Sequence, residues 1–337
     1  MKTKTYFVFL LGILLITSQT SKAQKFGLDY TSEFQTDFKN NYNFLNLLKL
    51  QAEVNISKHL SFQASTISTA KTNENKLIDD FQGFSNIEIE NIPLALAVAN
   101  FQWKINENNS IYLGVRNMNE DYFVSDVTSF YTNSSGGVFP TIGANYPIAN
   151  YPVASLGLHY SYNSENIALQ ASIYNGTAYS DFYGKESVFS FNPKNDGIFA
   201  ISQVEYKYNG SNYFLGACLH YGELDEIEDK ETRASIWAYA EQKIMEDFYL
   251  IGAYSYAFHS SSPCKDFAGV GGKFNLKDWE FGVLSTYCKF QDIREWANEI
   301  SIRYNIQDNL YIQPTFHFIN QPNHSHAIGL LRIGVNI

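Results

Sequence analysis

The sequence predicts an all-β protein, a transmembrane antiparallel β-barrel of about 16 strands whose long third extracellular loop folds into the lumen. Three observations lead to this fold class. Apolar and polar residues alternate along segments of roughly 10 residues, short polar turns alternate with longer connections, and one long connection is rich in aromatic residues and turn formers. Segments of this length match tilted strands that cross a bilayer, and the alternation of connections is typical of bacterial outer-membrane barrels.

The alternation is clearest near the two ends of the predicted barrel. Along 48–56 every second residue is apolar, and the last three segments, within 300–337, repeat this pattern. Successive side chains of a strand point to opposite faces, so the apolar set is expected to face lipid and the polar set the lumen. The expected strands are 25–36, 44–57, 60–70, 94–105, 110–118, 153–163, 166–176, 197–208, 212–221, 231–244, 247–258, 267–276, 278–289, 296–306, 309–319 and 327–337.

The connections between these strands predict the orientation of the barrel. Longer connections, such as 71–93, 119–152, 290–295 and 320–326, alternate with turns of a few polar residues. Outer-membrane barrels have short periplasmic turns and long extracellular loops, so both termini are expected in the periplasm. The last strand is expected to pair with the first and close the barrel, which removes its edges.

The N-terminal segment 1–23 is predicted to be a secretory signal peptide, followed by a barrel domain at 24–337. Two lysines precede a short apolar core at 6–16, and a small-x-small cleavage site ends at Ala23. This pattern is typical of a signal peptide. The alternative, a retained anchor, is disfavoured because the apolar core is too short to span a bilayer.

Composition narrows the classes of partner. The formal net charge is −10, which argues against nucleic acid as a partner. The chain has 24 Tyr, 26 Phe and 4 Trp, yet its mean hydropathy is only −0.23. Many aromatic residues in a chain of low hydropathy suit a wet lumen and an apolar outer band in contact with outer-membrane lipid. A secreted β-sandwich also has alternating strands, but the strand lengths and the aromatic residues at strand ends favour the barrel.

The stretch 119–151 has no alternating pattern. It combines glycines and prolines, which interrupt helices and strands, with seven aromatic residues. Loops of this length are usually functional or disordered, and the aromatic content argues against disorder. We therefore expect an ordered, irregular loop inside the lumen.

Several motifs resemble the carbohydrate-selective porin family (OprB-type). The similarity covers about two thirds of the chain, from near Asn100 to the end. The central motifs are Phe-Tyr-Thr-Asn-Ser-Ser-Gly-Gly at 130–137, Tyr-Pro-Val-Ala-Ser-Leu-Gly at 151–157 and Ala-Ser-Ile-Tyr-Asn-Gly at 171–176, and the C-terminal motifs lie at 295–300 and 311–322. Two positions depart from the family pattern: Gly137 replaces an aromatic residue, and Asn-Gln-Pro-Asn at 320–323 replaces Asn-Pro-Gly. The first departure implies a different contact surface on the loop, and with it a different sugar.

The resemblance implies a porin in the Gram-negative outer membrane that allows passive diffusion of mono- or oligosaccharides, as a monomer or a homotrimer. A barrel of about sixteen strands leaves an aqueous channel. A general non-specific porin, an outer-membrane hydrolase and an adhesin barrel remain alternatives. The sequence contains no Gly-x-Ser-x-Gly, His-Glu-x-x-His or phosphate-binding glycine motif, so no enzyme activity, catalytic residue, cofactor or metal site is predicted.

Selectivity in such a channel comes from a constriction, where pore diameter, hydrogen-bonding groups and charge decide passage. Aromatic faces can stack on sugar rings while charged groups bond sugar hydroxyls. The candidate pore-lining and substrate residues are Arg116, Glu120, Asp121, Tyr122, Asp126, Phe130, Tyr131, Glu205, Arg303, His317 and Arg332. The alternative for the charged residues is that they form a solvated array along the barrel wall and do not contact the substrate. The alternative for the aromatic residues is that they pin the loop to the wall.

Two of the three cysteines are expected to lie close together. The turn at 277–278 places Cys288 opposite roughly Phe267, a few residues from Cys264. Both would lie near the extracellular rim, in an oxidising setting where disulfides persist, so a bridge between them is an open alternative to free thiols. Cys218 has no obvious mate.

Overall fold

The computed structural model describes residues 24–222 and 230–337. The predicted signal peptide, 1–23, lies outside the described residues. Within the part of the chain that is described, no helix is long and apolar enough to cross a membrane.

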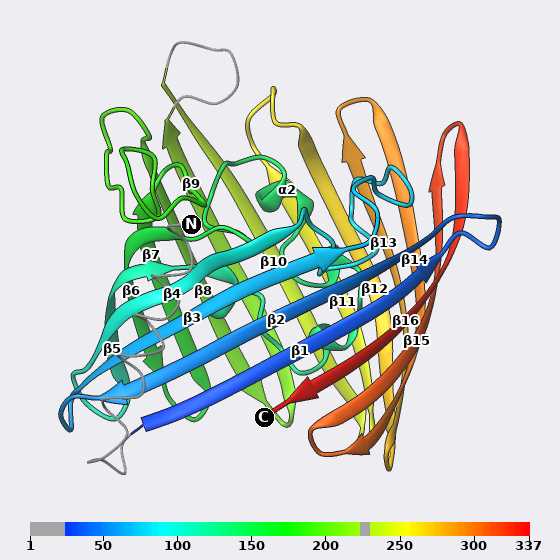
Figure 1. Cartoon of the computed structure of the whole chain (residues 1–337), viewed down its shortest axis with the longest axis horizontal. Coiled ribbons are helices and arrows are strands. Elements are labelled where there is room, and N and C mark those ends of the chain that lie inside the picture. The colour runs from blue at the N-terminus through cyan, green and yellow to red at the C-terminus, as the bar shows by residue number, and fades with distance from the viewer. Residues whose placement is uncertain (1–23, 223–229) are drawn as a thin grey trace, which may run out of the picture.

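Sixteen antiparallel strands form one closed barrel, which confirms the predicted fold class (Figure 1). Each strand pairs with its neighbours in sequence, and β1 pairs with β16 to close the ring, with Glu33 opposite Arg332. The strands are β1 Gln24–Thr36, β2 Tyr42–Asn55, β3 Leu60–Lys71, β4 Ile92–Lys104, β5 Asn109–Arg116, β6 Ser155–Asn163, β7 Ile167–Asn175, β8 Ile198–Tyr208, β9 Ser211–Gly222, β10 Glu231–Met245, β11 Phe248–Ala257, β12 Cys264–Leu276, β13 Trp279–Phe290, β14 Ile293–Gln307, β15 Leu310–Gln321 and β16 His324–Asn336.

The faces of the strands follow the predicted alternation. Leu331 and Ile333 of β16 are exposed on the outer surface, whereas Arg332 between them is buried inside. Leu50 of β2 is likewise exposed, and Glu33 of β1 is fully buried. The barrel therefore has an apolar outer face, while charged side chains such as Arg332 and Glu33 point inward, as expected of a membrane barrel.

Two connections predicted to be long are tight turns. β13 ends at Phe290 and β14 begins at Ile293, and β15 and β16 are separated by the two residues 322–323. In the first of these turns Gln291 has a φ of 52°, the left-handed conformation that two-residue hairpin turns require. The prediction of longer connections at 290–295 and 320–326 was wrong because the strands continue to the turn despite their polar sequence.

Two extracellular connections fold inward: the second loop (72–91) and the third loop (117–154). The third loop contains four short helical turns, η2 Met118–Glu120, η3 Thr128–Phe130, η4 Ser134–Gly136 and α2 Pro140–Gly143. Figure 1 shows α2 within the ring of strands. The largest apolar cluster lies between the third loop and the inner wall, and includes Phe139 and Ile142 from the loop with Trp237 and Phe267 from the wall. The third loop is therefore ordered inside the lumen, as predicted.

Candidate functional site: the loops in the barrel lumen

The third loop is closed at its base and bonded to the wall along its length. The Met118 backbone N–H donates to the Ala149 carbonyl at 2.7 Å, which brings the two arms of the loop together. On the first arm, the Tyr122 hydroxyl lies 2.7 Å from the Ser172 hydroxyl and donates to the Ile201 carbonyl at 3.1 Å. These contacts fix the start of the loop to β7 and β8.

The next aromatic pair fixes the middle of the loop to β12 and β13. The Tyr131 hydroxyl lies 2.7 Å from the Gly272 carbonyl oxygen and 3.1 Å from that of Val283. The Phe130 ring is fully buried and packs on Gly282, where a Cβ atom would lie only 2.4 Å from the ring. A side chain at position 282 would thus displace Phe130 and the loop with it.

Three wall residues bind the backbone or side chains of the third loop directly. Glu299 of β14 accepts hydrogen bonds from the backbone N–H groups of Thr132 at 2.8 Å and Asn133 at 2.9 Å. The His317 imidazole Nε2 lies 2.8 Å from the Thr132 hydroxyl. The Arg303 guanidinium lies 5.0 Å from the centre of the Phe130 ring and donates to the Phe130 carbonyl at 3.3 Å. His317 and Arg303 therefore position the loop.

The burial of Tyr122, Phe130 and Tyr131 corrects their expected role. Their exposed fractions are 1%, 0% and 1%. A ring with no exposed face has nothing to offer a sugar ring, so these three residues are not stacking faces in this structure. They anchor the loop to the wall, which was the alternative interpretation.

The second loop crosses the lumen from another side and is held by buried carboxylates. Glu295 of β14 accepts hydrogen bonds from the backbone N–H groups of Phe81 at 2.9 Å and Gln82 at 3.0 Å. The Ser85 hydroxyl donates to Glu33 at 2.7 Å. Both carboxylates are fully buried, and each satisfies loop groups that would otherwise be costly to bury.

The second and third loops also bind each other. The Asn86 N–H donates to the Thr132 carbonyl at 2.7 Å, and the Ser134 N–H donates to the Gly83 carbonyl at 2.8 Å. Gly83 has a φ of 64°, and a Cβ atom there would lie 2.7 Å from the Ser134 hydroxyl oxygen. The two loops therefore form one inward structure.

Arg332 links the two inward loops to the place where β1 and β16 pair and close the barrel. Its Nε donates to Glu33 at 2.7 Å, and its guanidinium also donates to the Asn86 side-chain oxygen at 2.6 Å. It is 4% exposed. Arg332 is thus a structural link between β1, β16 and the second loop.

Two further charged pairs join the start of the third loop to the inner wall of the barrel. Arg116 binds both carboxylate oxygens of Asp121 at 2.6 Å, and this pair is nearly buried. Lys49 of β2 binds Glu120 at 2.8 Å, with side chains 22% and 24% exposed. The Lys49–Glu120 pair joins the loop to a different part of the wall and retains access to solvent.

Asp126 and Glu205 are the least restrained of the candidates. Asp126 is exposed, and Glu205 is half-buried with a carboxylate oxygen 3.5 Å from the Lys207 ammonium. Together with Glu120 they offer carboxylate groups to solvent inside the lumen. Within the described residues, no group of three metal-binding side chains is assembled.

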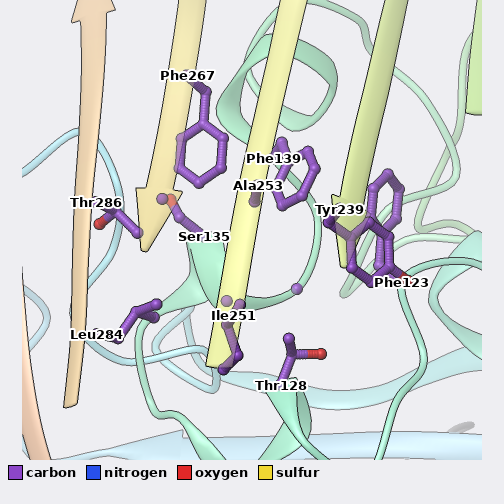
Figure 2. A pocket seen from close by; sticks show the side chains of 13 residues that line it. Phe123, Thr128, Ser135, Phe139, Tyr239, Ile251, Ala253, Phe267, Leu284 and Thr286 are labelled. Atoms are coloured by element: carbon purple, nitrogen blue, oxygen red, sulfur yellow. The ribbon is translucent and has the colours of Figure 1, made fainter. Parts of the chain in front are cut away.

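A small cavity lies where the third loop meets the wall of β10–β13 (Figure 2). Phe123 and Phe139 from the loop face Tyr239, Ile251 and Phe267 from the wall. Its volume is about 20 Å³, room for about one water. The cavity is a small gap in the packing between the third loop and the wall, and it is far too small for a sugar.

Sequence reasoning missed the inward course of the second loop and the wall carboxylates that hold the two loops. Glu299 lies on the predicted lumenal face, whereas Glu295 lies at the end of the connection predicted at 290–295. Their loop partners are remote in sequence, about 167 positions away for Glu299 and 213 for Glu295. One signal was present: the connection 71–93 contains Phe81 and Phe84, and both are buried or half-buried in the structure.

Comparisons with known structures place this fold among outer-membrane porins. No protein-family model and no curated protein matches the chain. OprB of Pseudomonas putida, in its high-pH structure, aligns with a TM-score of 0.77 and 14% identity over 94% of each chain. The anion-selective porin of Comamonas acidovorans aligns with a TM-score of 0.63 and 10% identity, over 94% of this chain and 99% of the porin. The outer membrane protein OmpT of Vibrio cholerae, in a trimer form, aligns with a TM-score of 0.61 and 10% identity, over 93% of this chain and 99% of OmpT.

These likenesses define the class of the protein by its fold: a closed β-barrel with the porin fold. At such identities the shared property is the fold. The resemblance to the carbohydrate-selective porins noted in the sequence is matched by the structural likeness to OprB.

Proposed function

We propose that this protein is a porin for neutral carbohydrates, which pass by diffusion through the lumen beside the two inward loops. The observation that carries the proposal is the pairing of charge inside the barrel. Lys49, Arg116 and Arg332 are matched by Glu120, Asp121 and Glu33, and Lys273 and Arg303 share Glu280.

Charge pairing of this kind favours an uncharged solute. An unpaired ring of cations or carboxylates would attract ions of the opposite sign. Paired groups keep their hydrogen-bonding capacity but produce a weaker field, and the half-exposed Lys49–Glu120 and Glu205–Lys207 pairs can bond hydroxyl groups. Weak, multiple contacts of this type allow a solute to bind and leave.

Conductance of the purified barrel in a planar bilayer tests this proposal. A neutral hexose and its oligomers should reduce the salt current with a saturating dependence on concentration. A polyethylene glycol of matched size is the control, and it should reduce current only as bulk conductivity falls. Equal effects of sugar and glycol would indicate a general porin, and absence of conductance would indicate an adhesin or hydrolase barrel.

The oligomeric state is part of the proposal. OmpT of Vibrio cholerae has been described in a trimer form, and a homotrimer or a monomer fits the barrel described here. Cross-linking in mild detergent separates the two. In a planar bilayer, the current should also close in three successive steps if three barrels associate.

A further inference from the structure

Three cations face outward at the extracellular ends of β12, β13 and β14. Cys288 is buried on the lumenal side, so its neighbours Tyr287 and Lys289 point to the outer surface. Arg294 lies directly opposite Lys289 in the ladder and is exposed. Lys265, beside the bulge in β12, places its ammonium 5.9 Å from the centre of the Tyr256 ring.

An aromatic layer lies immediately below these cations. Tyr287 pairs with Trp296 in register, their ring centres are 5.0 Å apart, and Trp296 is half exposed. Four residues further along each strand, beyond the Ser285–Asn298 pair, the non-polar pair Val283 and Ile300 occurs in the same outward phase. Aromatic residues mark the interface between hydrocarbon and polar headgroups. The cations therefore lie at the level of the headgroups.

The cations have no protein partner that accounts for their arrangement. Like charges directly opposite each other in a ladder are destabilising, yet among the described residues neither the Lys289 ammonium nor the Arg294 guanidinium takes part in an ion pair or hydrogen bond. Two carboxylates are near. Asp266 lies opposite Lys289 in register but accepts only the Tyr254 hydroxyl, at 3.5 Å, and Asp292 lies at the tip of the turn.

We propose that Lys265, Lys289 and Arg294 bind phosphate groups of the glycolipid in the outer leaflet of the membrane. Phosphate oxygens form strong charge-assisted hydrogen bonds with ammonium and guanidinium groups. An anion between Lys289 and Arg294 also relieves the repulsion of two like charges. This site lies on the outer wall and is independent of the proposed transport function.

Titration of the full barrel in neutral detergent with bisphosphorylated lipid A, followed by native mass spectrometry, tests the proposal. The double variant K289Q/R294Q should bind about 25-fold more weakly, from roughly fivefold per removed charge. The matched control, K58Q/K104Q, removes two exposed lysines at the opposite end of the barrel and should bind as the unaltered protein does. Gel mobility before and after heating confirms that each variant is folded.

Dephosphorylated lipid A separates phosphate recognition from contact with acyl chains. It should bind the unaltered protein and K289Q/R294Q equally and weakly. Equal affinity of both proteins for bisphosphorylated lipid A would overturn the proposal, as would unchanged binding after phosphate removal. If K289Q/R294Q instead loses an oligomer while keeping its lipid affinity, the surface is a contact between copies and the proposal is also overturned.

Discussion

Asn145 of the third loop pairs with the backbone of Cys264 in β12 through two reciprocal hydrogen bonds. Its side-chain amide donates to the Cys264 carbonyl at 2.7 Å, and its side-chain oxygen accepts the Cys264 N–H at 2.7 Å. The amide also donates to the Thr141 carbonyl at 2.8 Å. Asn145 thus completes the ladder of β12 at a bulge, in place of a strand, and fixes α2 to the wall.

Replacing this amide should release the end of the third loop. Asn145→Ala leaves the buried N–H and carbonyl of Cys264 without partners, at a cost of roughly 2–4 kcal/mol. We expect faster chymotrypsin cleavage within 122–151 and noisier single-channel current. Val124→Ala is the matched control because Val124 lies on the same loop with an exposed fraction of 57%. Identical cleavage of the two variants would show that Asn145 does not hold the loop.

The docking of the second loop should depend on pH through Asp80. Burial, followed by the nearby carboxylate of Glu295, raises the pKa of Asp80 to about 7, while Lys76 and the Phe84 N–H act in the opposite direction and Glu88 adds to the increase. Because the pKa of Asp80 is raised when the second loop is docked, the contribution of Asp80 to docking is most favourable below its ordinary pKa of about 4. This contribution is lost as the pH increases through about 7. The second loop should therefore loosen as the pH increases from about 4 to about 7, with little further change above that.

Trypsin cleavage after Lys76, an exposed residue of the second loop, measures this change. The rate should increase with pH relative to cleavage after Lys185, which is exposed in another loop and corrects for the activity of trypsin itself. Asp80→Asn carries no titrating proton and should give a constant ratio. A ratio that changes with pH equally in Asp80→Asn would refute the role of Asp80.

The thiols give a third prediction. Cys288 lies opposite Phe267, as the sequence predicted, and Cys288 and Cys264 are buried in the same apolar cluster. All three cysteines are free in the structure. In the oxidising periplasm we expect Cys264 and Cys288 to form a disulfide before the loop covers them, stabilising the fold by on the order of 3 kcal/mol. Thiol counting on denatured, unreduced protein should find one thiol, and a count of three would contradict this.

The orientation of the barrel is tested by labelling on intact cells. In a background with all cysteines replaced by serine, single cysteines at Lys185, Asn323 and Asp308 all occupy exposed positions. An impermeant maleimide should label the first two, which lie in extracellular connections, and leave the third, in a periplasmic turn, unlabelled. Labelling at Asp308 alone would reverse the orientation.

The strands could be predicted from the sequence because their signal is local. The two-residue period, as in Leu331 and Ile333 around Arg332, depends only on which face meets lipid. The pairing of Cys288 with Phe267 followed from counting residues along one hairpin. Most strand ends were placed within a few residues for the same reason.

The candidate site could be predicted only in part because its contacts are remote in sequence. The inward course of the third loop was readable from its composition. Whether Phe130 faces solvent or Gly282 was not, because the glycine that receives the ring lies about 150 positions away. The inward course of the second loop could not be predicted for the same reason: its carboxylate partners, Glu33 and Glu295, belong to β1 and β14, which are remote from the loop in sequence.

In the proposed function the third loop restricts the lumen, and the single-channel conductance of a barrel that lacks 124–149 tests this most directly. The sixteen strands should still assemble, because the ladders run between neighbouring strands without the loop. A deletion of 182–191 in another extracellular connection is the control and should leave conductance unchanged. We predict a larger conductance and loss of sugar block for the first deletion alone. If its conductance and sugar block equal those of the full-length barrel, the third loop does not govern passage.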